Sequence, residues 1–255
     1  MKYTLKKSLG QHFLKDDHIC QQIVQAVLSE KPDRLLEIGP GAGAITKYFL
    51  DHIDAFQFIA IDVDLEKIEY LQHFHPENAH VFLLQDILKA NPPFAEDFVV
   101  VGNFPYNISS QILFKMLDWR ENVPVIIGMF QKEVADRVAA KEGSRTYGII
   151  SVLIQAFYDV ELLFHVAPEA FDPPPQVKSS VIRLRRKNEI PVMTSVGDLF
   201  LLVKTAFQQR RKMLRNGLKG LMPADVLSDV FFQKRAEQLS VETFAALTFK
   251  MTKNQ

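Results

Sequence analysis

The stretch FVVVGNFPYNIS, residues 98–109, places an asparagine, a proline and a tyrosine directly after a run of apolar residues. The side-chain oxygen of Asn103 can accept a hydrogen bond from an amine, and Tyr106 offers a flat face for stacking. Pro105 has no N–H and favours a turn, which leaves nearby backbone carbonyls as further acceptors. We expect Phe104 to pack inward. Although Asn and Pro are also common in ordinary turns, the combination predicts a pocket for a flat base that carries an amino group.

Three glycines lie upstream, in LLEIGPGAGAIT, between an apolar run and an amphipathic segment. Gly39, Gly41 and Gly43 allow the backbone to approach a ligand closely, because no Cβ stands in the way. A tight turn alone would account for one or two of them. Their G-x-G-x-G spacing, preceded by Glu37, differs from the G-x-G-x-x-G of dinucleotide-binding proteins and weakens the case for NAD without excluding it.

Acidic residues close the next two apolar runs. Asp62 comes about twenty residues after the glycines, where a carboxylate can bind both hydroxyls of a ribose. Asp86 closes the following run and is suited to the exocyclic amine of an adenine. Asp64 is interpreted as the N-cap of the next helix. Any one of these acids could be a helix cap, but the aligned set favours a nucleoside-bearing ligand.

Alternating strands and helices must position these residues. From residue 33 to about 130, largely uninterrupted apolar runs alternate with amphipathic segments, which is typical of a parallel sheet covered on both faces. The predicted strands cover residues 34–39, 56–62, 80–86, 97–103 and 123–130, with helices at 44–53, 65–74 and 108–118. A doubly wound sheet of this kind binds ligands at the carboxyl ends of its strands, where the residues named above lie.

The later part of the chain continues with a helix and a strand in residues 147–166 and a closing strand in 178–186. Only helical patterns follow RRKNEIP. We therefore predict one domain of residues 1–187 and a small all-α domain of residues 188–255. With 255 residues and 47% hydrophobic composition, the chain can bury one large core and one small core.

The chain has one cysteine, Cys20, which falls among apolar residues at helical spacing and is expected to pack in a core. One cysteine permits no internal disulfide. No signal peptide and no apolar stretch long enough to cross a bilayer are recognisable. The sequence therefore predicts a cytoplasmic protein without a membrane partner.

The formal net charge of zero conceals a segregation of charge along the chain. Residues 183–219 hold ten Lys or Arg against two acids, and the first fifteen residues hold four lysines and no acid. Most charge runs are only solvated helix faces. Two basic segments in a neutral chain nevertheless favour contact with a polyanion.

The turn E-x-G-x-G-x-G, with an acid closing each of the next two strands, resembles that of the S-adenosylmethionine-dependent methyltransferases of the Rossmann-like class. NFPY is similar to the N-[LIF]-P-Y signature of amino-methyltransferases that act on adenine N6. SLGQHFLKD, FDPPPQVKSSVIRL and AFQQRRKMLRNGL are similar to the flanking signatures of the ribosomal RNA adenine N6,N6-dimethyltransferases, the KsgA family. These motifs extend, in a consistent order, over nearly the whole chain.

The resemblance implies a Rossmann-like class I methyltransferase fold, with a mostly parallel seven-stranded sheet and a small all-α C-terminal domain. It implies S-adenosyl-L-methionine as methyl donor and no metal. The residues that it implies as cofactor contacts are His12 and Leu14 at the border, Gly39 at the methionine part, Gly41, Asp62 at the ribose, Asp86 at the adenine, and Asn103. The family more often has Asn in place of His12 and Glu in place of the shorter Asp62.

The resemblance also implies a substrate, namely two adjacent adenines in the 3′-terminal hairpin loop of small-subunit (16S) rRNA, within the 30S subunit or its precursor. Asn103 and Pro105 would accept the two N6 hydrogens, and Tyr106 and Phe171 would stack on an extruded base. A basic helix spanning KTAFQQRRKMLRNGLKG would contact rRNA phosphates through Arg210, Arg211, Lys212 and Arg215. A monomer suffices for this activity.

Several alternatives stay open. A dimethyltransferase of large-subunit rRNA that confers antibiotic resistance shares the catalytic motifs, although FQQRRKMLRN favours the small-subunit enzyme. A mainly non-catalytic ribosome assembly factor would use the same basic surface, but the intact NFPY favours retained catalysis. A DNA adenine methyltransferase is less favoured because no separate base-reading module is recognisable. An NAD-dependent oxidoreductase is the remote alternative.

Overall fold

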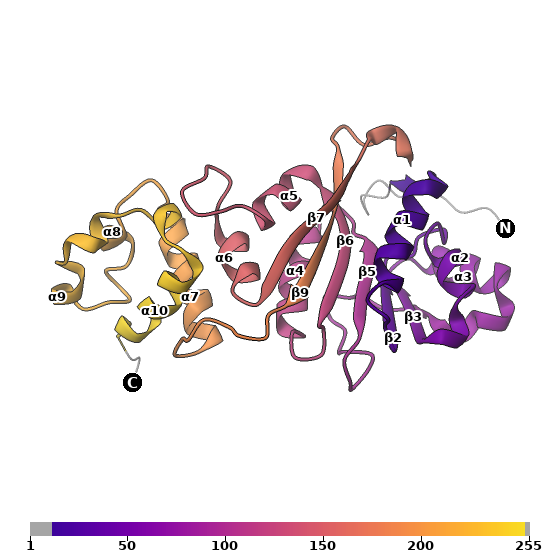
Figure 1. The fold of residues 1–255 in the computed structure, drawn as a ribbon, viewed down its shortest axis with the longest axis horizontal. Helices are drawn as coiled ribbons and strands as arrows, with labels where there is room; N and C mark the ends of the chain where they lie inside the picture. Colours follow the sequence, from indigo (N-terminus) through magenta and orange to yellow (C-terminus); the bar gives the residue numbers. More distant parts are fainter. Residues whose placement is uncertain (1–11, 253–255) are drawn as a thin grey trace. The chain divides into compact units, whose positions relative to one another are not determined.

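The computed structural model describes residues 12–252 and divides into two compact units (Figure 1). The first unit contains the chain as far as Ala135 together with Val160–Arg186, and the second contains Asp136–Asp159 and the chain from Lys187 onward. The change at residues 186 and 187 falls where the sequence places a domain end, whereas Asp136–Asp159 groups with the C-terminal helices. The assignment of separate functional domains stays a prediction.

The first unit is built, within the described residues, on a seven-stranded sheet of order β4-β3-β2-β5-β6-β9-β7. Its strands are β2 (Arg34–Ile38), β3 (Gln57–Asp62), β4 (Phe82–Leu84), β5 (Val99–Asn103), β6 (Val125–Gln131), β7 (Tyr158–Val166) and β9 (Ser179–Arg186). The neighbours from β4 to β6 are parallel, and β9 runs antiparallel to β6. The mostly parallel class I sheet is thus confirmed.

Three helices connect parallel strands, as such strands require: α2 (Thr46–Leu50), α3 (Leu65–Phe74) and α4 (Ser109–Asp118). α1 (Asp17–Leu28) precedes β2, and α5 (Lys132–Val138) follows β6. The predicted limits of α3 are confirmed, and so is its cap, because the Asp64 side chain accepts a hydrogen bond from the Glu66 N–H at 3.2 Å. The expected helix at 44–53 is shorter, since the glycine turn continues to Ile45 and the helix proper starts at Thr46.

The core lies between the sheet and these helices, and two glycines shape it. Gly102 on β5 pairs with Gly128 on β6, and a Cβ on Gly102 would lie 2.7 Å from the Phe104 ring. The fully buried Phe104 ring therefore occupies space that side chains on these strands would fill, which confirms its predicted inward packing. Cys20 is also buried in the core, as predicted, and burial raises the pKa of its thiol to about 12.

A separate antiparallel pair joins β1 (Phe13–Leu14) to β8 (Phe171–Asp172). Leu14 lies opposite Phe171, and the Lys15 N–H donates to the Ala170 carbonyl at 2.8 Å. This pairing brings a segment near the start of the chain beside the proline loop FDPPP, more than 150 residues later in the sequence.

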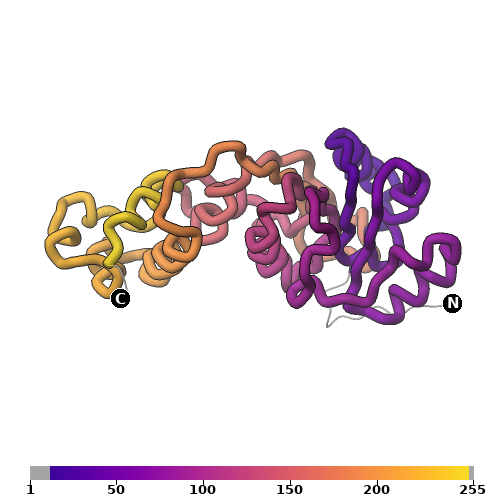
Figure 2. Tube along the Cα trace, turned by 90° about the horizontal axis from the view of Figure 1, so that it is seen from below, coloured from indigo at the N-terminus to yellow at the C-terminus, as the bar shows by residue number. Residues whose placement is uncertain are grey.

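The second unit is helical, as predicted (Figure 2). Its helices are α6 (Ile149–Gln155), α7 (Val196–Gln208), α8 (Leu214–Gly217), α9 (Ala224–Leu227) and α10 (Val241–Leu247), with short 3-10 turns between and after them. Between residues 12 and 252, no helix combines the length and apolar character needed to cross a bilayer.

The single basic helix expected over residues 204–220 is wrong. α7 ends at Gln208, and a turn precedes the four-residue α8. Tertiary hydrogen bonds explain the break, because the Leu214 N–H donates to the Lys234 carbonyl at 2.8 Å rather than to a preceding turn of helix. Two apolar side chains of this segment, Leu214 and Leu218, are buried.

Candidate functional site

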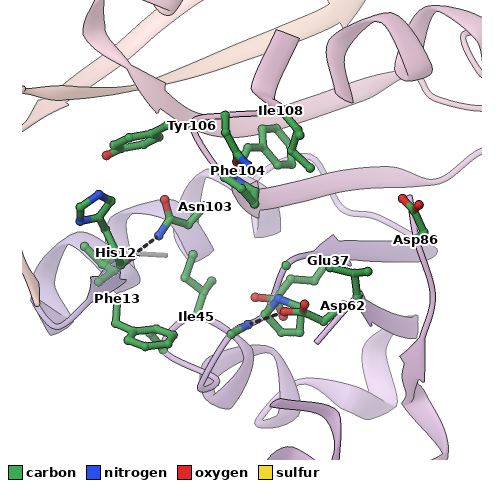
Figure 3. A pocket seen from close by; sticks show the side chains of 18 of the residues that line it. His12, Phe13, Glu37, Ile45, Asp62, Asp86, Asn103, Phe104, Tyr106 and Ile108 are labelled. Atoms are coloured by element: carbon green, nitrogen blue, oxygen red, sulfur yellow. Dashed lines mark hydrogen bonds between the residues drawn. The ribbon is translucent and has the colours of Figure 1, made fainter. Parts of the chain in front are cut away.

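A pocket of about 270 Å³ opens at the carboxyl ends of the parallel strands (Figure 3). This volume is near the lower end of the range for small-molecule sites, about 300–1,000 Å³. The pocket brings together nine of the residues predicted from the sequence, namely His12, Leu14, Gly39, Gly41, Asp62, Asp86, Asn103, Pro105 and Tyr106. Phe171 and the four basic residues of the second unit do not line it.

The glycine turn after β2 forms one wall of the pocket. Gly39 and Gly41 have φ angles of 71° and 57°, in the left-handed region that side chains disfavour. A Cβ on Gly41 would lie 3.0 Å from the Phe13 ring, so a side chain here would be both strained and tightly packed. The turn thereby exposes backbone to the pocket, as the sequence predicted.

Two carboxylates occupy the end of the pocket away from His12 and Tyr106 (Figure 3). Asp62 accepts backbone hydrogen bonds from Asp64 at 2.9 Å and from Gly41 at 3.4 Å, which fix its orientation. Burial raises the pKa of Asp62, and these hydrogen bonds oppose that effect. Asp86 accepts from the Leu88 N–H at 3.0 Å, so it also caps the turn after β4.

Glu37 is a pocket residue that the sequence reasoning did not assign to the ligand. Its side chain is buried, and its Oε2 atom has no hydrogen-bond partner among the described residues. Burial raises the pKa of Glu37 to about 8, and the nearby charge of Asp62 acts in the same direction. An unpaired buried polar atom is costly, so this oxygen points to a polar group of a ligand. The feature of the sequence that could have identified Glu37 as a ligand contact is its position near the end of β2, just before the glycine turn.

Asn103 ends β5 with its side chain in the pocket. Its Nδ2 donates a hydrogen bond to the backbone carbonyl of His12 at 3.1 Å. This bond turns the amide oxygen toward the side of the pocket where the Tyr106 ring lies (Figure 3). The site therefore presents an acceptor, rather than a donor, beside an aromatic face.

Pro105 and Tyr106 complete this end of the pocket. The Pro105 carbonyl accepts from the Ile108 N–H at 3.2 Å and retains a second lone pair for a ligand. The Tyr106 hydroxyl shares a 2.5 Å hydrogen bond with Ser179. The imidazole of His12 stacks on the Tyr106 ring, with 5.5 Å between ring centroids and 28° between planes.

The stacking of Phe171 on a base stays a prediction. The Phe171 ring is fully buried and belongs to the core cluster that also contains Leu14 and Val166. The pairing of β8 with β1 places Phe171 opposite Leu14 in this cluster.

The four basic residues predicted to contact RNA lie in the second unit, between α7 and the end of α8. Arg211, Lys212 and Arg215 are exposed. Arg210 is half-buried and donates to the backbone carbonyl of Arg145 at 2.6 Å, so part of its guanidinium supports the fold. Their contact with RNA stays a prediction.

The first part of the basic run is neutralised within the protein. Arg183 pairs with Glu30 at 2.8 Å and with Glu161 at 2.7 Å. The neighbouring basic residues also have acidic partners: Arg185 with Glu30 and Glu161, Arg186 with Asp97, and Lys187 with Asp159. The charge segregation seen in the sequence is therefore smaller in the folded protein.

Known proteins resemble this chain over nearly its whole length. The family model described as "Ribosomal RNA adenine dimethylase" matches residues 2–252. "Ribosomal RNA small subunit methyltransferase A" of Flavobacterium johnsoniae is 49% identical over 254 residues, which cover 98% of this chain and 97% of that protein.

Two solved structures share the architecture. A dimethyladenosine transferase from Plasmodium falciparum superposes with a TM-score of 0.76 at 25% identity, over 91% of this chain and 94% of that one. The 23S rRNA methyltransferase ErmE superposes with a TM-score of 0.67 at 20% identity, over 92% of this chain and 99% of that one. The second likeness is one of fold alone.

Proposed function

Because the chain belongs to the ribosomal RNA adenine dimethylase family, we propose that it dimethylates N6 of two adjacent adenines in the 3′-terminal hairpin loop of small-subunit rRNA. It is an rRNA adenine dimethyltransferase. The 49% identity to a small-subunit enzyme over nearly the full chain favours this target over large-subunit rRNA. The observation that carries the chemistry is the amide oxygen of Asn103, turned into the pocket beside Tyr106.

The pocket fits S-adenosylmethionine as methyl donor. The buried Glu37 oxygen without a partner and the exposed backbone of the glycine turn suit a polar ligand that reaches the end of β2. The residues that would hold the cofactor are Gly39 and Gly41 at its methionine part, Asp62 at the ribose, Asp86 at the adenine, and His12, Leu14 and Asn103 toward the target base. When bound, the cofactor supplies an electrophilic methyl group on a sulfonium.

The residues at the end of β5 prepare the target amine. The lone pair of adenine N6 is delocalised into the ring, so the nitrogen is a poor nucleophile until its hydrogens are drawn out of the ring plane. The Asn103 amide oxygen and the Pro105 carbonyl accept these two hydrogens and orient the lone pair. Acceleration then comes from proximity and alignment. The methylated N6 carries a positive charge after transfer and releases one proton to water, so no general base is needed.

The second transfer uses the same acceptors differently. A monomethylated amine has one N–H left, so only one of the two acceptors can be engaged while the methyl group takes the place of the other hydrogen. A paired base cannot reach this pocket, and the adenine must therefore be extruded from its loop and stacked, with Tyr106 as one face.

Replacing Asn103 tests the proposal. We expect Asn103→Ala to lower methyl transfer to unmethylated small subunits by about 100-fold or more, as loss of an aligned polar group in a transition state does. Asn91→Ala, at an exposed position between β4 and β5, is the matched control. Mass spectrometry of rRNA fragments would identify the methylated bases. Parent-like activity of Asn103→Ala would contradict the mechanism, and methylation in large-subunit rRNA would contradict the target.

A ribosome assembly factor is the second candidate function. The exposed Arg211, Lys212 and Arg215 could bind an immature subunit whether or not methyl transfer follows. The two roles are compatible, and a catalytically silent Asn103→Ala that still binds subunits would separate them. We place the protein in the cytoplasm, as a monomer that acts on the 30S subunit or its precursor.

A further inference from the structure

We propose that the Glu37 side chain carries a proton before the cofactor binds and releases it to the solvent on binding. The group that displaces the proton is a cationic centre in the methionine part of S-adenosylmethionine, either its ammonium or its sulfonium. This inference rests on the proposed function, since it requires this cofactor beside the glycine turn. Two neighbouring carboxyl groups with unequal surroundings are the evidence for it.

Glu37 and Asp62 lie beside each other in the pocket but differ in their hydrogen-bond donors (Figure 3). Asp62 accepts from the backbone N–H groups of Asp64 at 2.9 Å and Gly41 at 3.4 Å, and such donors favour the charged form. The Oε2 atom of Glu37 has no partner among residues 12–252, and the residue is only 2% exposed. A buried carboxylate oxygen without a donor is costly, so a proton held by these two neighbours resides on Glu37.

The elements packed around Glu37 bring mostly neutral groups to it. The residues paired with it on the adjacent strands are apolar, namely Ala60 on β3 and Val101 on β5. On α2 the buried Thr46 hydroxyl favours the charged form of the carboxyl. On α1 the Cys20 thiol also faces Glu37, and it is neutral because burial raises its pKa to about 12.

These surroundings keep the carboxyl protonated near neutral pH. Burial raises the pKa of Glu37 to about 8, the Asp62 charge acts in the same direction, and the Thr46 hydroxyl only partly opposes them. The buried cation of α3, Lys67, has its Nζ over the Phe13 ring, 4.9 Å from the centroid. Without a ligand, Glu37 is therefore mostly neutral at pH 7.

A cationic ligand reverses this balance. Glu37 and Gly39 both line the pocket, and we place Gly39 at the methionine part of the cofactor, which carries the positive sulfonium and a positive ammonium. An opposite charge within about 4–6 Å favours the charged form of a carboxyl. The Glu37 proton then passes to the solvent, and the ion pair supplies Oε2 with the partner that it lacks. A neutral ligand group at this position would leave the proton on the carboxyl.

Calorimetric titration of the full chain in buffers of different ionisation enthalpy counts the protons released on binding. At about pH 6.5 the α-amino group of the cofactor keeps its own proton, so this group does not contribute to the count. Three ligands separate the cationic centres. S-adenosylmethionine carries both of them, S-adenosylhomocysteine carries only the ammonium, and 5′-methylthioadenosine carries neither.

We expect the parent to release close to one proton with S-adenosylmethionine and none with 5′-methylthioadenosine. Its affinity for S-adenosylmethionine should rise about 10-fold per pH unit between about pH 5.5 and 7, because one proton must leave for each ligand bound. Glu37→Gln keeps the shape of the side chain but cannot ionise, so it should release about one proton fewer than the parent and lose this pH dependence. Glu189→Gln, at an exposed loop position, should behave like the parent.

The pattern across the ligands decides the proposal. Release with S-adenosylmethionine and S-adenosylhomocysteine alike assigns the displacing charge to the ammonium, and release with S-adenosylmethionine alone assigns it to the sulfonium. Either pattern supports the proposal.

Three outcomes would overturn it: binding of S-adenosylmethionine without proton release, equal release with 5′-methylthioadenosine, or full release by Glu37→Gln. The first two are decided on the parent protein, so they do not depend on the folding of a variant. If S-adenosylmethionine does not bind the parent at all, the proposed cofactor fails instead, and the two failures are thus distinguishable.

Discussion

A single hydrogen bond decides what the end of β5 offers to a substrate. If the Asn103 amide were turned over, its NH2 group would face the pocket and would repel an incoming amine. The His12 carbonyl accepts only from the nitrogen end, so it selects the orientation that accepts from adenine N6. The chemistry of the site therefore depends on a backbone atom 91 residues away in the sequence.

Glu37 gives a pH-dependent prediction at the same scale. Burial raises its pKa to about 8 from an ordinary value near 4.5, so the folded protein keeps a proton that the unfolded chain loses. The free energy of unfolding should therefore fall as pH rises from about 4.5 to about 8. Without cofactor, Glu37→Gln should match the parent near pH 4 and be more stable near pH 8, by on the order of a few kcal/mol.

Thermal unfolding across this pH range measures the effect. Glu189→Gln, at an exposed loop position, removes the same charge without burial and should show a parent-like profile. A constant offset between Glu37→Gln and the parent at every pH would show that the carboxyl does not titrate in this range.

Site residues that lie at the ends of strands could be predicted from the sequence. Asn103, Asp62 and Asp86 sit where parallel strands finish, and strand ends can be located from apolar periodicity. Phe171 and His12 do not follow from any period, because the β1–β8 pairing that buries one and presents the other joins distant segments. Glu37 was visible in the motif, but its unpaired oxygen is a property of packing alone.

At the scale of the element, two glycines on β5 and β6 make room for the ring that follows Asn103. The Phe104 ring lies over Gly102 and Gly128, and contacts the Phe130 ring edge-to-face with 5.0 Å between centroids. A Cβ on either glycine would overlap Phe104. This packing holds the chain immediately after Asn103 against the sheet.

We expect Gly128→Ala to destabilise the protein by about 1–3 kcal/mol, because an added methyl group overpacks the core. Methyl transfer should also fall, since a displaced Phe104 shifts its neighbours Asn103 and Pro105. Denaturant unfolding and transfer assays measure the two effects. Gly220→Ala, where a Cβ meets nothing within 4 Å, should leave both unchanged. Full stability of Gly128→Ala would mean that the ring has an alternative position.

Elements were predicted well where local signals agree and poorly where tertiary contacts intervene. α3 has a capping aspartate before it and an amphipathic pattern within it, and its predicted limits are those observed. The basic segment has a helical composition throughout, but the hydrogen bond from Leu214 to Lys234 interrupts it. No local property of the segment indicates that partner.

At the scale of the whole molecule, the basic residues divide into paired and exposed sets. Arg183 and its neighbours are paired with acids, whereas within residues 12–252 no acidic side chain forms an ion pair with Arg211 or Lys212. Exposed cations release counterions when they meet phosphates, and paired cations do not. Charge counted along the sequence cannot make this distinction, because Glu30 and Glu161 are remote from the basic run.

A double variant tests this division. Arg211→Ala combined with Lys212→Ala should weaken binding to small-subunit rRNA and reduce the slope of log affinity against log salt by about 2. Arg183→Gln should leave the slope unchanged and lower the free energy of unfolding by about 1–3 kcal/mol, because it removes one partner of Glu30, whose side chain is only 12% exposed. If both variants reduced the slope of log affinity against log salt equally, the distinction between paired and exposed basic residues would be wrong.

The β1–β8 pair has a consequence for the order in which the enzyme becomes competent during its own translation. A nascent chain that has emerged only through β6 contains the glycine turn, both carboxylates and Asn103. It still lacks Phe171 and Asp172, which pair with β1. It also lacks the Pro173 carbonyl, which is hydrogen-bonded to the His12 imidazole, and Ser179, which is hydrogen-bonded to the Tyr106 hydroxyl. Domains form progressively from the N-terminus as they are made. Methylation competence therefore arrives late, after the glycine turn, both carboxylates and Asn103 have been made, because β1 and the residues around the target base are aligned only by segments that follow β7.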